Sequence, residues 1–244
     1  MRKLMSRFQN PFDPYPGLSD LAREVRRSHE PLGFRLIAES LIMGVQYVVG
    51  AAVEGDIVEF GTHSGRTARM ISMAMKHYQT EKSLHLFDSF EGMPESQNPV
   101  DLDNAHVKSG VWGKGQLRGI SPEELRKGCA KFIKPEAIKI YKGWFSDTLS
   151  KIPRGTRFGM IHVDSDLYSS AFEVLDYLFR TGAVSEGALL FFDDWNCNRA
   201  SNNHGERKAW KEIIDLYAVS CEDMGGYGWA AHKFVVHSYS ARTA

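Results

Sequence analysis

Two apolar runs of this sequence each end in a pair of acidic residues. "LLFFDDWN" places Asp193 and Asp194 side by side, and "IHVDSDLYSS" places Asp164 and Asp166 two residues apart. If the two runs form neighbouring strands, their carboxylates meet at one edge of a sheet and repel each other unless a cation lies among them. Oxygen ligands without cysteine or paired histidine favour Mg²⁺ or a similar divalent ion. A helix cap with a salt bridge is the alternative for Asp193 and Asp194.

A glycine-containing turn lies earlier in the chain, in "VEFGTHSGRT" (58–67). The pattern predicts a strand, a sharp turn at Gly61 and a helix start, with Gly65 allowing close approach of a ligand or another chain segment. It differs from the dinucleotide fingerprint, because G-x-x-x-G replaces G-x-G-x-x-G. Glu59 precedes the turn and would place a carboxylate beside the bound group. That charge suits a ligand with an amino group or a sulfonium better than a pyrophosphate.

A second acidic strand end follows in "LHLFDSFEG" (84–92), where Asp88 closes the apolar run. A carboxylate at this position can accept hydrogen bonds from both ribose hydroxyls of an adenosine. An aspartate that caps a helix or a turn is the alternative. Because Asp88 comes one strand after the glycine turn, we favour a nucleoside site.

Two further features concern the surroundings of this site. His204 follows the second acidic pair in a polar loop and is the histidine that could reach a substrate, whereas we expect His162, inside a predicted strand, to lie in the core. The stretch 92–119 is polar, contains glycine and lacks periodicity. A loop of this length is either functional, for example a lid, or a surface insertion.

The elements that must position these residues alternate between strands and helices. Strands are predicted at 57–60, 83–88, 137–143, 158–166 and 187–194, and an edge hairpin at 228–238. Helices are predicted at 19–30, 31–52, 62–78, 121–133, 169–179 and 206–218. The alternation predicts an α/β fold with a mostly parallel sheet covered on both faces, which binds ligands at the carboxyl ends of its strands.

The composition excludes several classes of partner. Thirty basic and thirty acidic residues cancel, so no overall charge attracts the chain to nucleic acid or to an anionic membrane. The longest apolar segment, 41–53, is too short to span a bilayer, and residues 1–17 lack the apolar stretch of a secretory signal. Three cysteines without paired spacing fit a reducing compartment, so we expect a cytoplasmic protein.

Together these motifs resemble the macrocin O-methyltransferase family, whose members depend on S-adenosylmethionine (SAM) and magnesium. The resemblance rests on "VEFGTHSGRT", "LFDSFEGMPE", "YKGWFSDTL", "HVDSDLYSS" and "FFDDW", and covers roughly residues 55–215. It implies a Rossmann-like class I methyltransferase fold with seven strands, in which 1–54 form an N-terminal helical arm and 55–244 the methyltransferase domain. It also implies a homo-oligomer that methylates a hydroxyl of a small molecule, a sugar or another part of a natural product.

The resemblance also implies roles for individual residues. The cofactor would contact the glycine turn, the second strand end and the "KGWF" segment, namely Glu59, Gly61, Thr62, Ser64, Gly65, Arg66, Thr67, Asp88, Ser89, Phe90, Gly143, Trp144, Phe145 and Asp164. The metal would be held by Asp166, Asp193 and Asp194, although Asp164 and Asp166 could exchange roles. Asp166 is the first choice for the catalytic base and His204 the second.

Two other functions predict different observations. An NAD(P)-dependent oxidoreductase on a similar sheet needs a G-x-G-x-x-G turn and a Tyr-Lys or histidine proton relay, neither of which is found in the sequence. A non-catalytic regulator that binds SAM or a metal would keep the pocket and lose the chemistry. The acids present at all the matching positions argue against the regulator.

Overall fold

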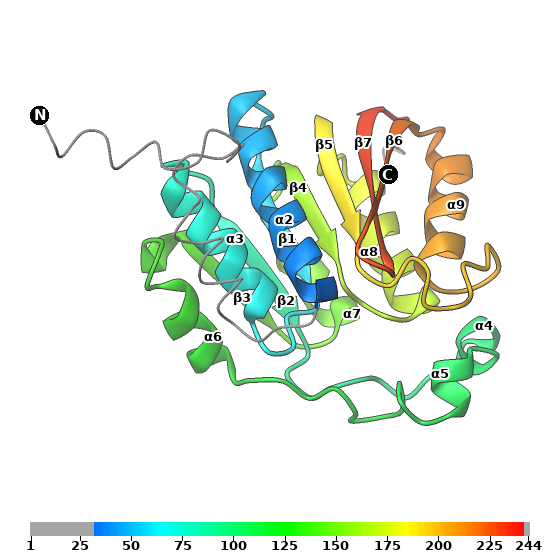
Figure 1. Cartoon of the computed structure of the whole chain (residues 1–244). Coiled ribbons are helices and arrows are strands. Elements are labelled where there is room, and N and C mark those ends of the chain that lie inside the picture. The colour runs from blue at the N-terminus through cyan, green and yellow to red at the C-terminus, as the bar shows by residue number, and fades with distance from the viewer. Residues whose placement is uncertain (1–31, 242–244) are drawn as a thin grey trace, which may run out of the picture.

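The computed structural model describes residues 32–241, which form a seven-stranded sheet with helices on both faces (Figure 1). The strands follow the order β3-β2-β1-β4-β5-β7-β6; the first five are parallel, and β7 runs antiparallel to both of its neighbours. Their bounds are β1 Asp56–Phe60, β2 Leu84–Asp88, β3 Ile138–Lys142, β4 Phe158–Val163, β5 Val184–Phe192, β6 Ser220–Tyr227 and β7 Ala231–Ser238. The predicted α/β fold is confirmed. The helix predicted at 19–30 lies outside the described residues.

The helices divide between the two faces of the sheet. One face carries α2 (Leu32–Gly50), α3 (Arg66–His77) and α6 (Pro122–Cys129), and the other carries α8 (Tyr168–Arg180) and α9 (Gly205–Tyr217). Residues 32–241 also contain the short α-helices α4 (Pro99–Leu102), α5 (Ala105–Lys108) and α7 (Phe145–Thr148). In the part of the chain that the structure describes, no helix is both long and apolar enough to cross a bilayer.

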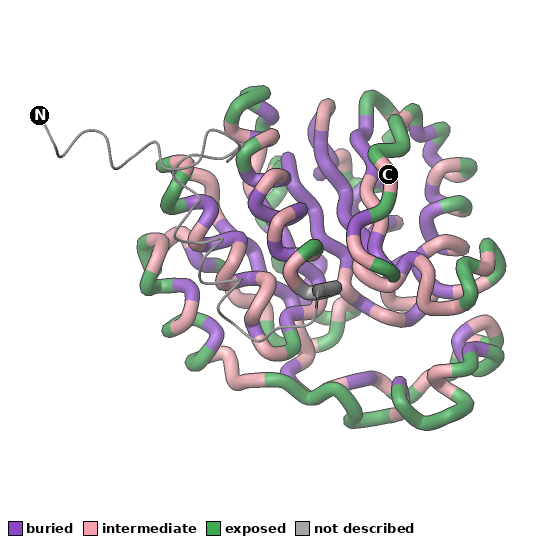
Figure 2. Tube along the Cα trace, viewed as in Figure 1, coloured by how far each residue is buried: buried purple, intermediate pink, exposed green. Residues whose placement is uncertain are grey.

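Strand periodicity separates the core into two layers. In β4 all six residues are buried, with Met160 packing in the layer of α2 and α3, and Ile161 in the layer of α8 and α9. Strands buried on both faces read as continuous apolar runs, which is why the sequence revealed them. Figure 2 shows these strands as buried along most of their length. The same alternation decides to which side each polar residue at a strand end points.

The strand order reverses between β1 and β4, and their carboxyl ends lie in contact at this point. Gly61 directly follows β1 with a φ of 90°, and a Cβ added to it would lie 1.8 Å from the backbone oxygen of Asp164. The backbone N–H of Asp164 donates to the Phe60 oxygen at 2.9 Å. Open parallel sheets bind ligands at such a reversal.

Some boundaries differ from those predicted. Strand β6 was not predicted, because "SCEDMGGY" is polar and only Tyr227 in it is buried; as an edge strand it needs no apolar face. Helix α6 begins with the predicted Ser121–Glu124 capping box but ends at Cys129, earlier than predicted. Helix α2 packs against the sheet beside α3, with Leu41 and Val45 fully buried. The division of the chain at residue 54 stays a prediction.

The stretch 92–119 carries α4 and α5 to the side of the molecule where α8 and α9 lie (Figure 1). It is fastened there by Asp101, a buried side chain of α4 whose two carboxylate oxygens accept hydrogen bonds from the backbone N–H groups of Tyr168 and Ser169. These are orphan donors at the start of α8, and a carboxylate satisfies them well. The stretch is therefore docked onto the sheet domain.

Candidate active site

A cavity of about 850 Å³ opens at the carboxyl ends of the parallel strands. Its walls come from the ends of β1, β2, β3, β4 and β5 and from the stretch 92–119. The lining residues are Gly61, His63, Asp88, Ser89, Gly92–Asn98, Leu117, Gly143–Ser146, Asp164–Leu167, Ser169, Ser170, Glu173, Asp193 and Asp194. The volume is of the size that proteins use for a small ligand or cofactor.

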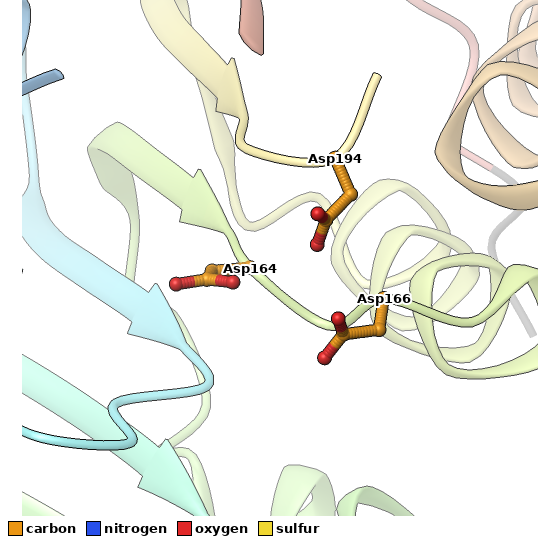
Figure 3. Close-up of side chains that lie close together, drawn as sticks. All are labelled: Asp164, Asp166 and Asp194. Carbon is orange, nitrogen blue, oxygen red and sulfur yellow. The ribbon is translucent and has the colours of Figure 1, made fainter. Parts of the chain in front are cut away.

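Three carboxylates meet at one side of this cavity (Figure 3). One oxygen from each of Asp164, Asp166 and Asp194 lies within 4.8 Å of the others. Asp164 follows β4, Asp194 follows β5, and Asp166 lies in the turn that leads into α8. Asp166 has a φ of 61°, a left-handed conformation that is uncommon outside glycine and is often found at functional sites.

The cluster holds more negative charge than its surroundings balance. Removal from water, followed by repulsion from neighbouring carboxylates, raises the pKa of Asp164 and of Asp166 well above the ordinary value. The same two causes raise the pKa of Asp194 to about 6. A bound cation would remove the repulsion and replace the lost water. The all-oxygen donor set and its charge therefore fit Mg²⁺ or a similar divalent ion.

The three acids that converge differ from the predicted metal set in one member. The converging set contains Asp164, whereas the predicted set contained Asp193. Asp164 and Asp193 directly follow the register partners Val163 and Phe192, so both lie on the face of the sheet that α2 and α3 cover, and the Oδ1 atom of Asp193 lies 3.8 Å from Nε2 of His162. Asp193 also lines the cavity, and its Oδ1 atom is buried without a hydrogen-bond partner. Which of the four acids hold a metal stays a prediction.

Glu59 and His162 form an ionisable pair next to the cluster, although the sequence predicted Glu59 at the cofactor and His162 in the core. Glu59 does not line the cavity; its Oε1 atom lies 2.9 Å from Nδ1 of His162, and both side chains are fully buried. Burial opposes a charge on His162, but Asp193 and Glu59 outweigh it and raise the pKa of the imidazole to about 10. His162 is in the core as predicted, and it contacts two acids there, Glu59 and Asp193. The role of Glu59 in holding the cofactor stays a prediction.

Asp194 is supported by two side chains that the sequence did not single out. The Cys197 thiol donates to Asp194 Oδ1 at 3.0 Å, and the backbone N–H of Asp194 donates to Glu206 Oε2 at 2.9 Å. Glu206 is buried at the start of α9, and removal from water followed by repulsion from Asp194 and Asp193 raises its pKa well above the ordinary value. A glutamate in the first turn of a helix is so common that nothing in the pattern marked it.

The glycine turn is held by Asp88. Its Oδ2 atom accepts from the backbone N–H groups of Thr62 and His63 and from the Thr62 hydroxyl, at 2.7, 3.0 and 3.0 Å, and Oδ1 accepts from the Phe90 N–H at 2.7 Å. Oδ2 therefore accepts three of these hydrogen bonds and Oδ1 only one, which leaves Oδ1 an acceptor site for a ligand such as a ribose hydroxyl.

The predicted cofactor residues divide into two groups. Those that line the cavity are Gly61, Asp88, Ser89, Gly143, Trp144, Phe145 and Asp164. Those that do not are Glu59, Thr62, Ser64, Gly65, Arg66, Thr67 and Phe90. The close approach at Gly65 is to another part of the chain, because a Cβ there would meet the side chains of Leu125 and Ile120 at 2.8 and 2.9 Å.

His204 lies outside the cavity lining. It precedes α9, and its Nε2 atom lies 3.1 Å from Asp103 Oδ2 and its Nδ1 atom 3.1 Å from the Ser201 hydroxyl. Asp103 belongs to the stretch 92–119, so this contact joins the stretch to α9 just as Asp101 joins it to α8. The same stretch supplies cavity wall, including Ser96, whose hydroxyl oxygen is buried and unpartnered. A catalytic role for His204 and a lid role for the stretch stay predictions.

The raised pKa of Asp194 predicts how stability depends on pH without a metal. Between the ordinary value of 3.8 and about 6 the folded state binds this proton more tightly than the unfolded state, so stability falls as pH rises. The full change corresponds to about 3 kcal/mol. We expect urea unfolding in EDTA to show Asp194→Asn more stable than the wild type at pH 7.5 by about 2–3 kcal/mol, with little difference at pH 4. An equal difference at both pH values would contradict a raised pKa of Asp194 in the folded protein.

Comparison with known proteins agrees with this architecture. A family model described as macrocin-O-methyltransferase (TylF) matches residues 32–218. The 8-demethyl-8-(2,3-dimethoxy-alpha-L-rhamnosyl)-tetracenomycin-C 4'-O-methyltransferase of Streptomyces olivaceus is 29% identical over 174 residues, which are 69% of this chain and 63% of that protein. The match thus spans less than two thirds of the relative's length.

Solved structures are similar in fold. The O-methyltransferase NovP has a TM-score of 0.69 at 22% identity and covers 84% of this chain and 81% of its own. The calicheamicin methyltransferase CalS11 has a TM-score of 0.66 at 18% identity, with 91% and 93% covered. The fold is therefore that of the class I O-methyltransferases, as predicted. Because the family model covers well over half of the 244 residues, the chain belongs to the macrocin O-methyltransferase family.

Proposed function

We propose that this protein is a SAM- and Mg²⁺-dependent O-methyltransferase that methylates a hydroxyl of a small molecule, a sugar or another part of a natural product. The observation that carries the proposal is the meeting of Asp164, Asp166 and Asp194 in one cavity with the glycine turn. Family membership supports the reaction type. The name of the Streptomyces olivaceus relative describes a rhamnosyl tetracenomycin as its acceptor, which supports a glycosylated acceptor here.

The acid cluster is the proposed cation site. Asp164, Asp166 and Asp194 already lie close enough to share one ion, and Asp193 borders the same cavity. When bound, a divalent cation stabilises the negative charge that develops as a hydroxyl of the acceptor loses its proton. The protein fixes the ligands at the ends of two neighbouring strands, so little reorganisation is needed when the acceptor arrives.

The proposed cofactor site is the part of the cavity next to the glycine turn. Gly61 and the turn after it border this part, with Ser89 and Asp88 at the end of β2 and the aromatic rings of Trp144 and Phe145 after β3. An aromatic ring gives an adenine a flat apolar surface, and the polar groups fix its orientation. Bound SAM would supply an electrophilic methyl group, and these residues would hold the cofactor in the cavity beside the acid cluster.

Asp166 is the proposed base. It lines the cavity, and removal from water followed by repulsion from Asp194 and Asp193 raises its pKa well above the ordinary value. A base must lie within reach of the proton that it removes, and Asp166 lies in the cavity beside the other acids of the proposed cation site. His204, the second choice in the sequence, faces Asp103 instead.

Calorimetry and a methyl-transfer assay test the proposal. We expect SAM to bind and NADH not to bind, because the glycine turn lacks the dinucleotide pattern. Methyl transfer to a panel of glycosylated acceptors should require Mg²⁺ and should disappear with EDTA and return with excess Mg²⁺. SAM binding without turnover on any acceptor, with Mg²⁺ present, would favour the non-catalytic regulator. Turnover that is unchanged in EDTA would contradict the metal requirement.

A further inference from the structure

A row of ionisable side chains crosses three neighbouring strands beneath the acid cluster. Glu59 in β1 is the register partner of His162 in β4, and His162 is the partner of Phe191 in β5. Asp193 comes two residues after Phe191 and therefore points to the same face of the sheet. The row Glu59–His162–Asp193 thus runs from the core to the wall of the cavity.

The contacts along this row are directional. His162 Nδ1 lies 2.9 Å from Glu59 Oε1, a hydrogen bond between two fully buried side chains. On the other side of the same ring, Nε2 lies 3.8 Å from Asp193 Oδ1. Both of these atoms are buried, and neither has a hydrogen-bond partner within residues 32–241. A small rotation of the Asp193 side chain would close this second hydrogen bond.

The row lies within an otherwise apolar layer of the core. The layer around it consists of apolar side chains such as Ile57, Met160 and Phe191, and the Phe191 ring lies edge-on to the His162 imidazole with 6.4 Å between centroids. Buried ion pairs are often no more stabilising than apolar residues of equal volume. Such pairs can instead fix the geometry of neighbouring side chains, and here the last member of the row is Asp193, which lines the cavity.

We infer that His162, held by Glu59, is a positioning residue that directs one oxygen of Asp193 into the core and leaves the other for the cavity. The inference rests on the proposed cation site. Acids around a bound ion are commonly oriented by hydrogen bonds from residues behind them, and the loss of such a partner weakens metal binding about 10–100-fold. The row also couples β1, which leads into the glycine turn, to the acids of β5.

Substitutions at residue 162 separate the two ends of the ring. In His162→Asn the amide can still donate to Glu59 but is too short to reach Asp193, whereas in His162→Gln it extends toward Asp193. With MnCl₂ as the probe, measured by EPR of the free ion, we expect Asn to weaken binding about 10-fold or more. We expect Gln to recover most of the affinity, and SAM affinity to stay within about threefold of the wild type for both, because His162 does not line the cavity.

His85→Asn is the matched control. His85 is another buried histidine of the sheet, with Nε2 3.1 Å from Asp56 Oδ2, and its partner lies at the start of β1, the end of the strand away from the acid cluster. We expect its urea midpoint to fall while Mn²⁺ affinity stays unchanged. If His162→Asn fails to fold, Glu59→Gln replaces it, because the amide oxygen still accepts from Nδ1 but the charge is lost; we expect about threefold weaker Mn²⁺ binding.

The outcomes separate this inference from the proposed function. A His162→Asn or Glu59→Gln protein that unfolds more easily but binds Mn²⁺ as tightly as the wild type would overturn the inference alone, leaving the pair as a packing feature. Equal weakening by Asn and Gln at position 162 would also overturn it, because reach toward Asp193 would not matter. A wild type that binds no Mn²⁺ would overturn the cation site and the inference with it.

Discussion

Asp194→Asn and Asp166→Asn should each lower kcat/KM for Mg²⁺-dependent methyl transfer by about 10³-fold while SAM affinity stays within about threefold. Each substitution replaces a charged oxygen of the cluster with an amide, which neither attracts a cation as strongly nor accepts a proton. Their oxygens lie within 4.8 Å of that of Asp164, so the loss of one weakens the whole set. The assay is initial rate against Mg²⁺ concentration, with SAM binding measured by calorimetry.

The control for this experiment is Asp215→Asn, which removes the same charge from an exposed position of α9. We expect its Mg²⁺ dependence and rate to match the wild type. Full Mg²⁺-dependent activity in either cluster variant would show that the metal assignment is wrong. A parallel loss of SAM affinity would instead place these acids at the cofactor.

Most of the fold could be predicted from the apolar runs of the sequence and from the residues at which they end. Strands such as β4, buried on both faces, read as continuous apolar segments, and the helices between them show one-sided periodicity. The capping box at Ser121 marked the start of α6. The edge strand β6 was missed because its exposed residues carry no apolar pattern. The pairing of strands depends on residues far apart in the chain, so an exposed edge strand is the part of a sheet that is hardest to predict from the sequence.

The candidate site was predictable to the level of the strand ends but not to that of side-chain direction. The acids at 164, 166, 193 and 194 were located, but not which of their oxygens lie close together: one oxygen from each of Asp164, Asp166 and Asp194 lies within 4.8 Å of the others, whereas Asp193 Oδ1 lies 3.8 Å from Nε2 of His162. Contacts between distant segments were also hidden. Glu59 and His162 are 103 residues apart in the chain, and neither residue type signals such a partner. The first turn of α9 likewise gave no sign that Glu206 would support Asp194.

The acid cluster opposes folding and at the same time supplies the proposed chemistry. Crowded carboxylates raise one another's pKa, so the metal-free protein loses stability as these groups ionise. A cation that binds the folded state recovers this stability by mass action. Asp194→Asn should therefore combine increased stability without metal at pH 7.5 with nearly complete loss of methyl transfer. Such opposite effects are typical of functional sites.

Gly61→Ala should have the largest effect on stability, a loss of more than about 4 kcal/mol or failure to fold. The added Cβ would lie 1.8 Å from the backbone oxygen of Asp164, a position that no side-chain rotation can relieve. The ends of β1 and β4 would have to separate, which breaks the hydrogen bond from Asp164 N–H to the Phe60 oxygen. The φ of 90° at Gly61 adds the cost of a conformation that alanine rarely adopts.

Gly155→Ala separates the two causes. Gly155 has a φ of 81°, close to that of Gly61, but a Cβ there would meet no atom within 4 Å. Urea unfolding should therefore show a loss of about 1–2 kcal/mol for Gly155→Ala, the cost of the backbone conformation alone. The remainder of the Gly61→Ala effect measures the close contact between β1 and β4. Similar losses for the two variants would contradict the contact, and with it the view that Gly61 serves to bring the glycine turn against the first acid of the cluster.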